Sequence, residues 1–342
     1  MNKQNDSTPS IALEFLQSGI SLPFSSSIGA QILSLVQQPL EKIDIAALVK
    51  LVQVDPGFTT KILQLANSAY FGSLNKITSL RQAVVHIGLE ETINIIYLLL
   101  CRNTLPKFPS LNGEFSDKDF WLHSWGCAVA NKMLGHPEVG GSVLPGELYI
   151  AGLLHGIGKL ILAIHQPEDF LQCLRNSKDF GQPLAEAEQD IIGTTSAEIA
   201  SEVLKAWQLS ENVCMAVRYY QYPDKAEKKY REIAGLTQFA YFLANTSGVG
   251  NMHDEFSFDL QETWITRESS LPLAHETTQK NVTQRIHQVL QAKSLTLDAL
   301  DNTADAEKED DPPPVGKTGK IDRNTTVTKK FSFFQWLRSL FS

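Results

Sequence analysis

The sequence is poor in cysteine, and its few cysteines do not form a recognisable metal or redox motif. Only four occur in 342 residues, at Cys101, Cys127, Cys173 and Cys214, and none forms a C-x-x-C pair. They lie far apart in apolar, helix-like settings, so a disulfide framework is not indicated. We predict that all four are small core residues of a protein in a reducing compartment.

The sequence also lacks a long hydrophobic run and a recognisable export signal. The longest apolar run, residues 93–101, contains Asn94 and is far shorter than the roughly 20 residues that a membrane-spanning helix needs. Residues 1–10 are polar and have neither the basic start nor the apolar stretch of a signal peptide. We therefore expect a soluble body with a cytoplasmic location.

Positive charge is in deficit. The formal net charge is −8 and the isoelectric point is near 5.5, which argues against a surface that binds nucleic acid as a whole. No nucleic-acid partner is expected, although a local basic patch stays open. With 43% hydrophobic and 20% charged residues, the composition is that of a globular protein with one large domain or two.

Alternating strand patterns bounded by hairpin turns are absent, and the pattern from Ile11 to about Asp301 is helical. Asp55-Pro56 predicts the start of a helix that continues to a stop at Gly72. Ser79 with Gln82, and Thr195 with Glu198, are capping-box patterns that predict two further helix starts. An all-α fold follows.

We divide the chain into four segments. Residues 1–10 are predicted to be flexible, and residues 11–300 to form one domain with an N-terminal helical part (11–110) and a second part (111–300). Residues 301–328 are acidic and polar with three consecutive prolines, so they predict a disordered linker. Residues 329–342 predict an amphipathic aromatic helix.

The C-terminal segment carries the predicted interaction residues. Its apolar side chains fall on one helical face, and basic residues flank them: Phe333, Trp336, Leu337, Leu340, Phe341, Lys329, Lys330 and Arg338. Such an aromatic cluster is unusual unless it docks. Three interpretations stay open: docking on the chain's own body, binding in a partner's groove, or lying on an anionic membrane surface, peripheral at the inner membrane.

Several motifs together resemble one family. The first half carries Val54-Asp55-Pro56 and three stretches at residues 63–70, 77–84 and 87–89; the second half carries His123-Ser124, residues 151–158 and Trp207. In this order they resemble HDOD domain proteins, bacterial signalling and output modules related to the HD phosphohydrolases. The resemblance implies a multi-helix HDOD fold whose second part is a degenerate HD-like core.

The resemblance also implies what is missing for catalysis. An active HD enzyme needs carboxylate and imidazole ligands around metal ions. His123 and His155 remain, but Gly156 replaces the aspartate of the name-giving pair. Where the family often keeps further ligands, the chain has Ser196, Tyr220-Gln221 and Tyr241. Because a catalytic zinc usually has at least three protein ligands, we expect no metal, no cofactor and no catalysis.

His123 and His155 are therefore interpreted as relic positions, each on an inward helix face and hydrogen-bonded to a neighbour. The glycines at positions 152, 156 and 158 predict close helix packing. Asn67-Ser68 and Thr194-Thr195-Ser196 are interpreted as capping and turn residues. The aromatic stretch 218–222 faces either a groove or the core, and both alternatives stay open.

Three functions are compatible with these observations. The first is a non-enzymatic signal-transduction module that acts through protein contacts and carries a C-terminal tether. The second is a residual metal-dependent phosphohydrolase built on His123 and His155. The third is a sensor whose former metal cavity binds a nucleotide or another small ligand. The sequence favours the first.

Overall fold

The computed structural model describes residues 7–18, 31–32, 35, 40–54, 56–67, 71, 76–105, 110–135, 143, 145–249, 263–267, 280–281, 283–284 and 286–290. Within these ranges all regular structure is helical and no strand occurs, which confirms the predicted all-α fold.

The α-helices follow one another along the chain as α1 (Ser7–Gln17), α3 (Ile45–Val52), α4 (Pro56–Ala66), α5 (Leu80–Ile87), α6 (Leu89–Thr104), α7 (Asp117–Leu134), α8 (Pro145–Leu154), α9 (Ile157–His165), α10 (Pro167–Phe180), α11 (Leu184–Ile191), α12 (Ser196–Ala206), α13 (Glu211–Tyr219), α14 (Arg231–Thr246) and α15 (Trp264–Arg267). Short 3-10 turns are η1 (Leu40–Lys42), η3 (Pro223–Lys225) and η4 (Lys228–Tyr230).

These elements form two compact units. The small unit lies within Pro39–Ile93 and holds η1, α3, α4, α5 and the start of α6. The large unit lies within Met1–Gln38 and Asn94–Ser294 and holds α1, most of α6, and α7 to α15.

Local capping defines the helices of the small unit. Asp44 caps α3 by accepting hydrogen bonds from two backbone amides, and Ser79 caps α5 by accepting one from Gln82. The Gln82 side chain bonds Thr78 instead of completing the predicted reciprocal box. Gly88 ends α5 with a φ of 88°, which favours glycine. The predicted boundaries of α5 are therefore confirmed.

Asn67 lies directly after α4 and links the chain to the segment before α5. Its amide nitrogen donates to the carbonyls of Leu63 and Ile77, both at 2.8 Å, and its oxygen accepts from the Ile77 amide at 2.7 Å. The helix therefore ends at Ala66, earlier than the stop predicted at Gly72. These bonds support the structural interpretation of Asn67.

Replacing Asn67 by alanine is expected to destabilise the small unit by about 1 to 3 kcal/mol, because the Ile77 backbone groups lose their side-chain partner. Urea unfolding followed by circular dichroism measures the loss. Gln64→Ala, one turn earlier on the same helix, is the matched control and should change stability by less than about 0.5 kcal/mol. Equal effects of the two substitutions would contradict a stabilising role of the hydrogen bonds between Asn67 and Ile77.

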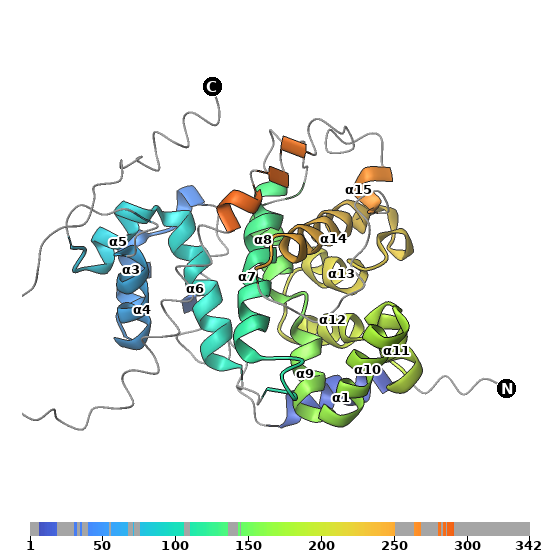
Figure 1. The fold of residues 1–342 in the computed structure, drawn as a ribbon. Coiled ribbons are helices and arrows are strands. Elements are labelled where there is room, and N and C mark those ends of the chain that lie inside the picture. The colour runs from blue at the N-terminus through green and yellow to red at the C-terminus, as the bar shows by residue number, and fades with distance from the viewer. Residues whose placement is uncertain are drawn as a thin grey trace, which may run out of the picture. The chain divides into compact units, whose positions relative to one another are not determined.

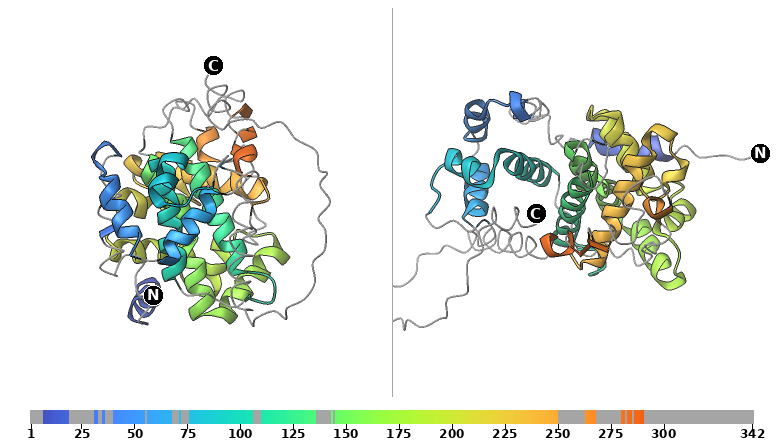
Figure 2. Two further views of the ribbon diagram at one scale, coloured as in Figure 1. Left: turned by 90° about the vertical axis from the view of Figure 1, so that its left-hand side faces the viewer. Right: turned by 90° about the horizontal axis from the view of Figure 1, so that it is seen from above.

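The core of the large unit is built around α7. Nearly every residue of this helix from Phe120 to Asn131 is buried, on all of its sides, which is typical of a central helix. Helices α8 and α14 pack against it and against each other, and they lie beside it in the front view and in the view from above (Figures 1 and 2). The Asn131 side chain joins all three helices by donating to Leu148 and Thr237.

Two glycines allow the helices of this core to touch through their backbones, as predicted. A Cβ at Gly152 would lie 2.6 Å from the carbonyl oxygen of Cys127, and one at Gly158 would lie 1.8 Å from that of Ser196. The first contact joins α8 to α7, and the second joins α9 to α12. Any side chain at these positions would force the paired helices apart.

Helix α1 belongs to the large unit, although the small unit follows it in sequence. It packs against α9 and α12, and its buried residues include Ile11, Ala12 and Phe15. The Phe15 ring meets His165 edge-on, with ring centroids 5.8 Å apart.

Residues Pro145–His165, which include α8 and α9, are long and apolar enough to cross a membrane. However, 83% of the most apolar window is buried inside the protein, as expected for core helices. The bent pair Leu80–Ile87 and Leu89–Arg102, with an angle of 116°, would pass the same test only as one broken span.

The predicted linker, residues 301–328, and the predicted C-terminal helix, residues 329–342, lie outside the described residues. The predictions for both segments therefore stay predictions.

Candidate functional site

The two histidines singled out in the sequence meet in the core of the large unit. His123 lies on α7, and His155 lies in the turn between α8 and α9. Their ring centroids are 5.4 Å apart. Two tyrosines complete what we call the four-ring cluster: Tyr220, directly after α13, and Tyr241, on α14.

The four-ring cluster is closed to solvent. The Tyr241 ring lies edge-on to both histidines, with its centroid 5.1 Å from that of His123 and 5.4 Å from that of His155. The centroids of Tyr220 and His155 are 5.3 Å apart. The exposed fractions are 0% for His123, 1% for His155, 1% for Tyr220 and 2% for Tyr241. The aromatic side chains thus fill the space around the imidazoles.

The tautomer of His155 follows from its hydrogen bond. Its Nδ1 lies 2.7 Å from the carbonyl oxygen of Gly152, which can only accept, so Nδ1 carries the proton. Burial lowers the pKa of His155 to about 3, although the Gly152 bond opposes this shift, so the ring is neutral at pH 7. Its Nε2 therefore bears a free lone pair, and it has no hydrogen-bond partner among the described residues.

His123 is paired with Cys127, which the sequence predicts only as a small core residue. Its Nε2 lies 3.2 Å from the Sγ of Cys127, one helical turn further along α7. Burial, with smaller effects of His155 and Lys159, lowers the pKa of His123 well below its usual value. Burial also raises the pKa of the Cys127 thiol well above 9, so the free protein holds a neutral thiol there.

A lysine completes the surroundings of the cluster. Lys159, on α9, is fully buried, and its Nζ lies 5.5 Å from the centroid of the Tyr241 ring. Its positive charge contributes to the lowered pKa values of both histidines. Helix α9, which carries Lys159, follows α8 after the turn formed by His155 and Gly156.

The positions where the resemblance implies further metal ligands of an HD enzyme do not supply them here. Gly156 has no side chain and stands at the start of α9. Ser196 uses its amide and hydroxyl to bond the buried carboxylate of Glu188, at 2.7 and 3.0 Å. Gln221 is buried, and its backbone carbonyl accepts a hydrogen bond from the side chain of Gln238. Tyr241 brings a phenol ring into the cluster.

These residues do not fit the metal centre of a phosphohydrolase. Among the described residues, the group of ligand side chains close enough to hold an ion is His123, Cys127 and His155, and it contains no carboxylate. Hard divalent ions such as Mg²⁺ and Mn²⁺ prefer oxygen ligands. No hydrolytic step through such an ion can be built from this set.

The predicted place of one site residue was wrong, and two further residues were not predicted as parts of the site. His155 was predicted on a helix face, whereas α8 ends at Leu154 and His155 lies in the turn before α9. The two residues that were not predicted are Cys127 and Lys159. The spacing of four between His123 and Cys127 was the available signal, because such residues share one helix face.

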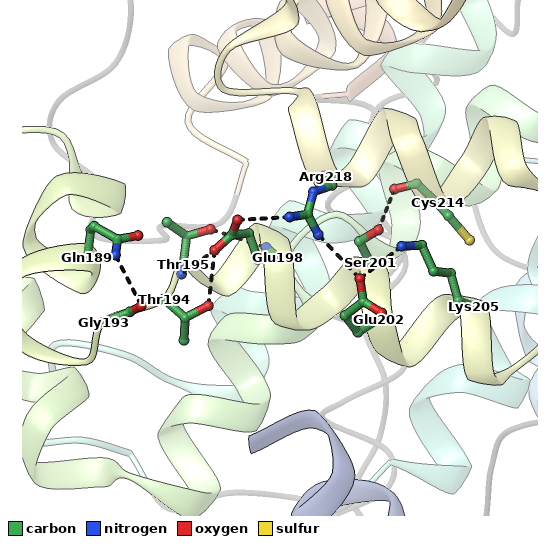
Figure 3. A network of polar contacts seen from close by, with 10 residues as sticks. All are labelled: Gln189, Gly193, Thr194, Thr195, Glu198, Ser201, Glu202, Lys205, Cys214 and Arg218. Carbon is green, nitrogen blue, oxygen red and sulfur yellow. Dashed lines mark hydrogen bonds and ion pairs between the residues drawn. The ribbon is translucent and has the colours of Figure 1, made fainter. Parts of the chain in front are cut away.

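A polar network fixes helix α12 at the edge of the site (Figure 3). Arg218, on α13, bonds Glu198 at 3.0 Å and Glu202 at 3.3 Å. Thr195 and Glu198 form the predicted capping box at the start of α12. Capping thus explains Thr195, as predicted. The Thr194 hydroxyl donates to Glu198, and the Ser196 hydroxyl donates to Glu188.

The aromatic stretch 218–222 is divided between the core and the surface. Tyr220 belongs to the four-ring cluster and Gln221 is buried, whereas Arg218, Tyr219 and Tyr222 are half-buried. Lys225 lies over the Tyr222 ring at 4.1 Å. The core interpretation is confirmed for Tyr220, and the half-buried side chains cover the surface around it.

A comparison with protein families identifies the family of the chain. The HDOD domain model matches residues 22–223, more than half of the chain. The chain belongs to the HDOD domain family. Three members of the four-ring cluster, His123, His155 and Tyr220, lie within the matched residues.

Relatives of this HDOD protein share its fold at low identity. A candidate signal transduction protein of Marinobacter aquaeolei VT8 is 21% identical, with a TM-score of 0.70 over 86% of this chain and 66% of that one. An HDOD domain protein of Geobacter sulfurreducens (22%) and a candidate phosphohydrolase of Shewanella amazonensis SB2B (20%) both have TM-scores of 0.64. The two alignments cover 86% and 85% of this chain, respectively, and 98% of each of the two solved chains.

A curated but uncharacterised protein of Treponema pallidum (strain Nichols) is 23% identical over 207 residues. That match takes in 60% of this chain and 39% of the relative, so the chain spans about two fifths of that protein's length.

Proposed function

We propose that this HDOD protein is a non-catalytic signal-transduction module that acts through protein contacts. The closed four-ring cluster carries the proposal. A phosphohydrolase must bring a phosphate group to metal-activated water, but here Tyr220 and Tyr241 fill the space beside the histidines and all four rings are buried.

The donor set supports the same conclusion. The four-ring cluster and Cys127 together offer two imidazoles, two phenol rings and one thiol. Among the described residues, the buried carboxylate is that of Glu188, and it accepts hydrogen bonds from Ser196. A fixed lysine, Lys159, supplies positive charge without metal chemistry. The four-ring cluster thus serves as part of the packed core of the large unit.

A module without catalysis transmits its signal by association. We place this association at the C-terminal segment, where Phe333, Trp336 and Leu340 would share one helical face behind a long linker. Lys329, Lys330 and Arg338 would face an acidic partner or anionic lipid headgroups. The location that follows is cytoplasmic, or peripheral at the inner membrane.

Deleting residues 331–342 is expected to abolish partner capture and vesicle binding, while the melting temperature of the body stays nearly unchanged. Pull-downs and flotation with phosphatidylglycerol vesicles compare the full chain, the deletion and the point variant Trp336→Ser. Loss from vesicles alone would identify lipid as the ligand. A melting temperature that falls by many degrees would show instead that the segment packs on the body, and the tether proposal would fail.

A further inference from the structure

Three side chains in the core offer metal-ligand atoms to one point. One ligand atom each of His123, Cys127 and His155 lies within 4.8 Å of the other two, and all three residues are buried. The closest pair, His123 Nε2 and Cys127 Sγ, is 3.2 Å apart. The proposed signalling function uses none of these atoms.

The Nε2 atom of His155 is buried without a hydrogen-bond partner. Buried polar atoms are usually paired, so this free lone pair calls for a ligand. His123 offers its Nε2 beside the Cys127 thiol, and its unpaired Nδ1 is not counted toward the site. His155 also has the arrangement of a metal-binding histidine, because its other nitrogen donates to the Gly152 carbonyl and fixes the ring.

The distances suit a small ion with little rearrangement. Metal bonds of about 2.0 Å to nitrogen and about 2.3 Å to sulfur place three ligand atoms about 3.5 to 4 Å apart around a trigonal ion. Separations up to 4.8 Å reach this range by small side-chain rotations. Tyr220 and Tyr241 pack tightly beside this group, so they leave little space for a further bulky ligand on the ion.

Ligand type and charge select the ion. A thiolate with two imidazoles is a soft set that suits Cu(I) or Zn²⁺. With Zn²⁺, the complex would keep one positive charge in a dry core beside the Lys159 ammonium, which is costly. With Cu(I), thiolate and ion neutralise each other, and Lys159 favours the thiolate.

We propose that His123, Cys127 and His155 together bind one cuprous ion. Binding displaces the thiol proton of Cys127 to solvent and leaves the oxidation state of copper unchanged. The closed three-ligand site carries out no hydrolysis, so this inference goes beyond the signalling function and does not depend on it.

Anaerobic titration of the full chain with Cu(I), in competition with a chromophoric Cu(I) chelator, tests the site. Copper is added to the folded protein and also during refolding, so that slow entry into the core cannot hide binding. We expect one equivalent to bind with a thiolate-to-copper band in the ultraviolet. Cys127→Ser should weaken binding by more than about 100-fold, beyond what loss of an outer-shell partner costs.

Cys214→Ser is the matched control, because Cys214 is also a buried free cysteine but does not belong to the group of ligand side chains. It should bind copper like the wild type, and His155→Gln should weaken binding as Cys127→Ser does, with folding of each variant checked by circular dichroism. Three results would overturn the proposal: no binding to the wild type, equal binding by Cys127→Ser, or displacement of copper by equimolar Zn²⁺.

Discussion

Gly158→Ala is expected to lower the free energy of unfolding of the large unit by at least about 3 kcal/mol, or to prevent folding. The new methyl group would lie 1.8 Å from the carbonyl oxygen of Ser196 and 2.6 Å from its carbonyl carbon. Both are backbone atoms, so no flexible side chain can move away. Helices α9 and α12 would have to separate, and the bonds from Ser196 to Glu188 would be strained with them.

Gly146→Ala provides the control for this prediction. Gly146 lies near the start of α8, is exposed, and has no atom within 4 Å of an added Cβ. Alanine there should raise stability by up to about 1 kcal/mol, because it restricts the unfolded chain. Urea unfolding of both variants measures the difference. A stability of Gly158→Ala within about 1 kcal/mol of the wild type would contradict the close packing of α9 on α12.

Acid should destabilise the metal-free protein through its two buried histidines. In the folded state the pKa of His155 is about 3, and that of His123 is also well below 6.5. Both therefore stay neutral in the folded protein as the pH falls, whereas the unfolded chain binds their protons below about pH 6.5. The stability that these histidines contribute is complete above pH 6.5 and is lost progressively below it, toward pH 3 for His155.

The expected slope is about 1.4 kcal/mol per pH unit for each histidine between pH 6 and 5, where the acidic side chains titrate little. Urea unfolding at several pH values, with a chelator present, measures it. His155→Gln should reduce the slope by about 1.4 kcal/mol per pH unit, whatever its effect on stability at pH 7.5. An unchanged slope in this variant would mean that His155 is protonated in the folded protein.

Local sequence signals predicted local structure well. Ser79 and Thr195 mark helix starts because a side-chain oxygen and the backbone amides it bonds are only a few residues apart. The glycines at positions 152 and 158 indicated close packing because nothing else explains glycine inside apolar helices. These features depend on short-range geometry, so the sequence alone carries them.

Features that depend on contacts between distant segments could not be predicted. The packing of α1 on α12 joins residues that are far apart in the chain, and no local pattern encodes it. The ring contacts of His123 and His155 with Tyr220 and Tyr241 required the fold to bring four separate segments together. Cys127 was the exception, since its spacing from His123 already placed both on one face of a helix.

The most direct test of the proposed function is a measurement of hydrolysis. The full chain and His155→Gln are assayed on phosphomonoester and phosphodiester substrates, including cyclic dinucleotides, with Mg²⁺, Mn²⁺, Fe²⁺ or Zn²⁺ present. The closed cluster without carboxylate ligands predicts that both proteins show the same background rate with every metal. Turnover by the full chain that is lost in a folded His155→Gln variant would contradict a non-catalytic HDOD module.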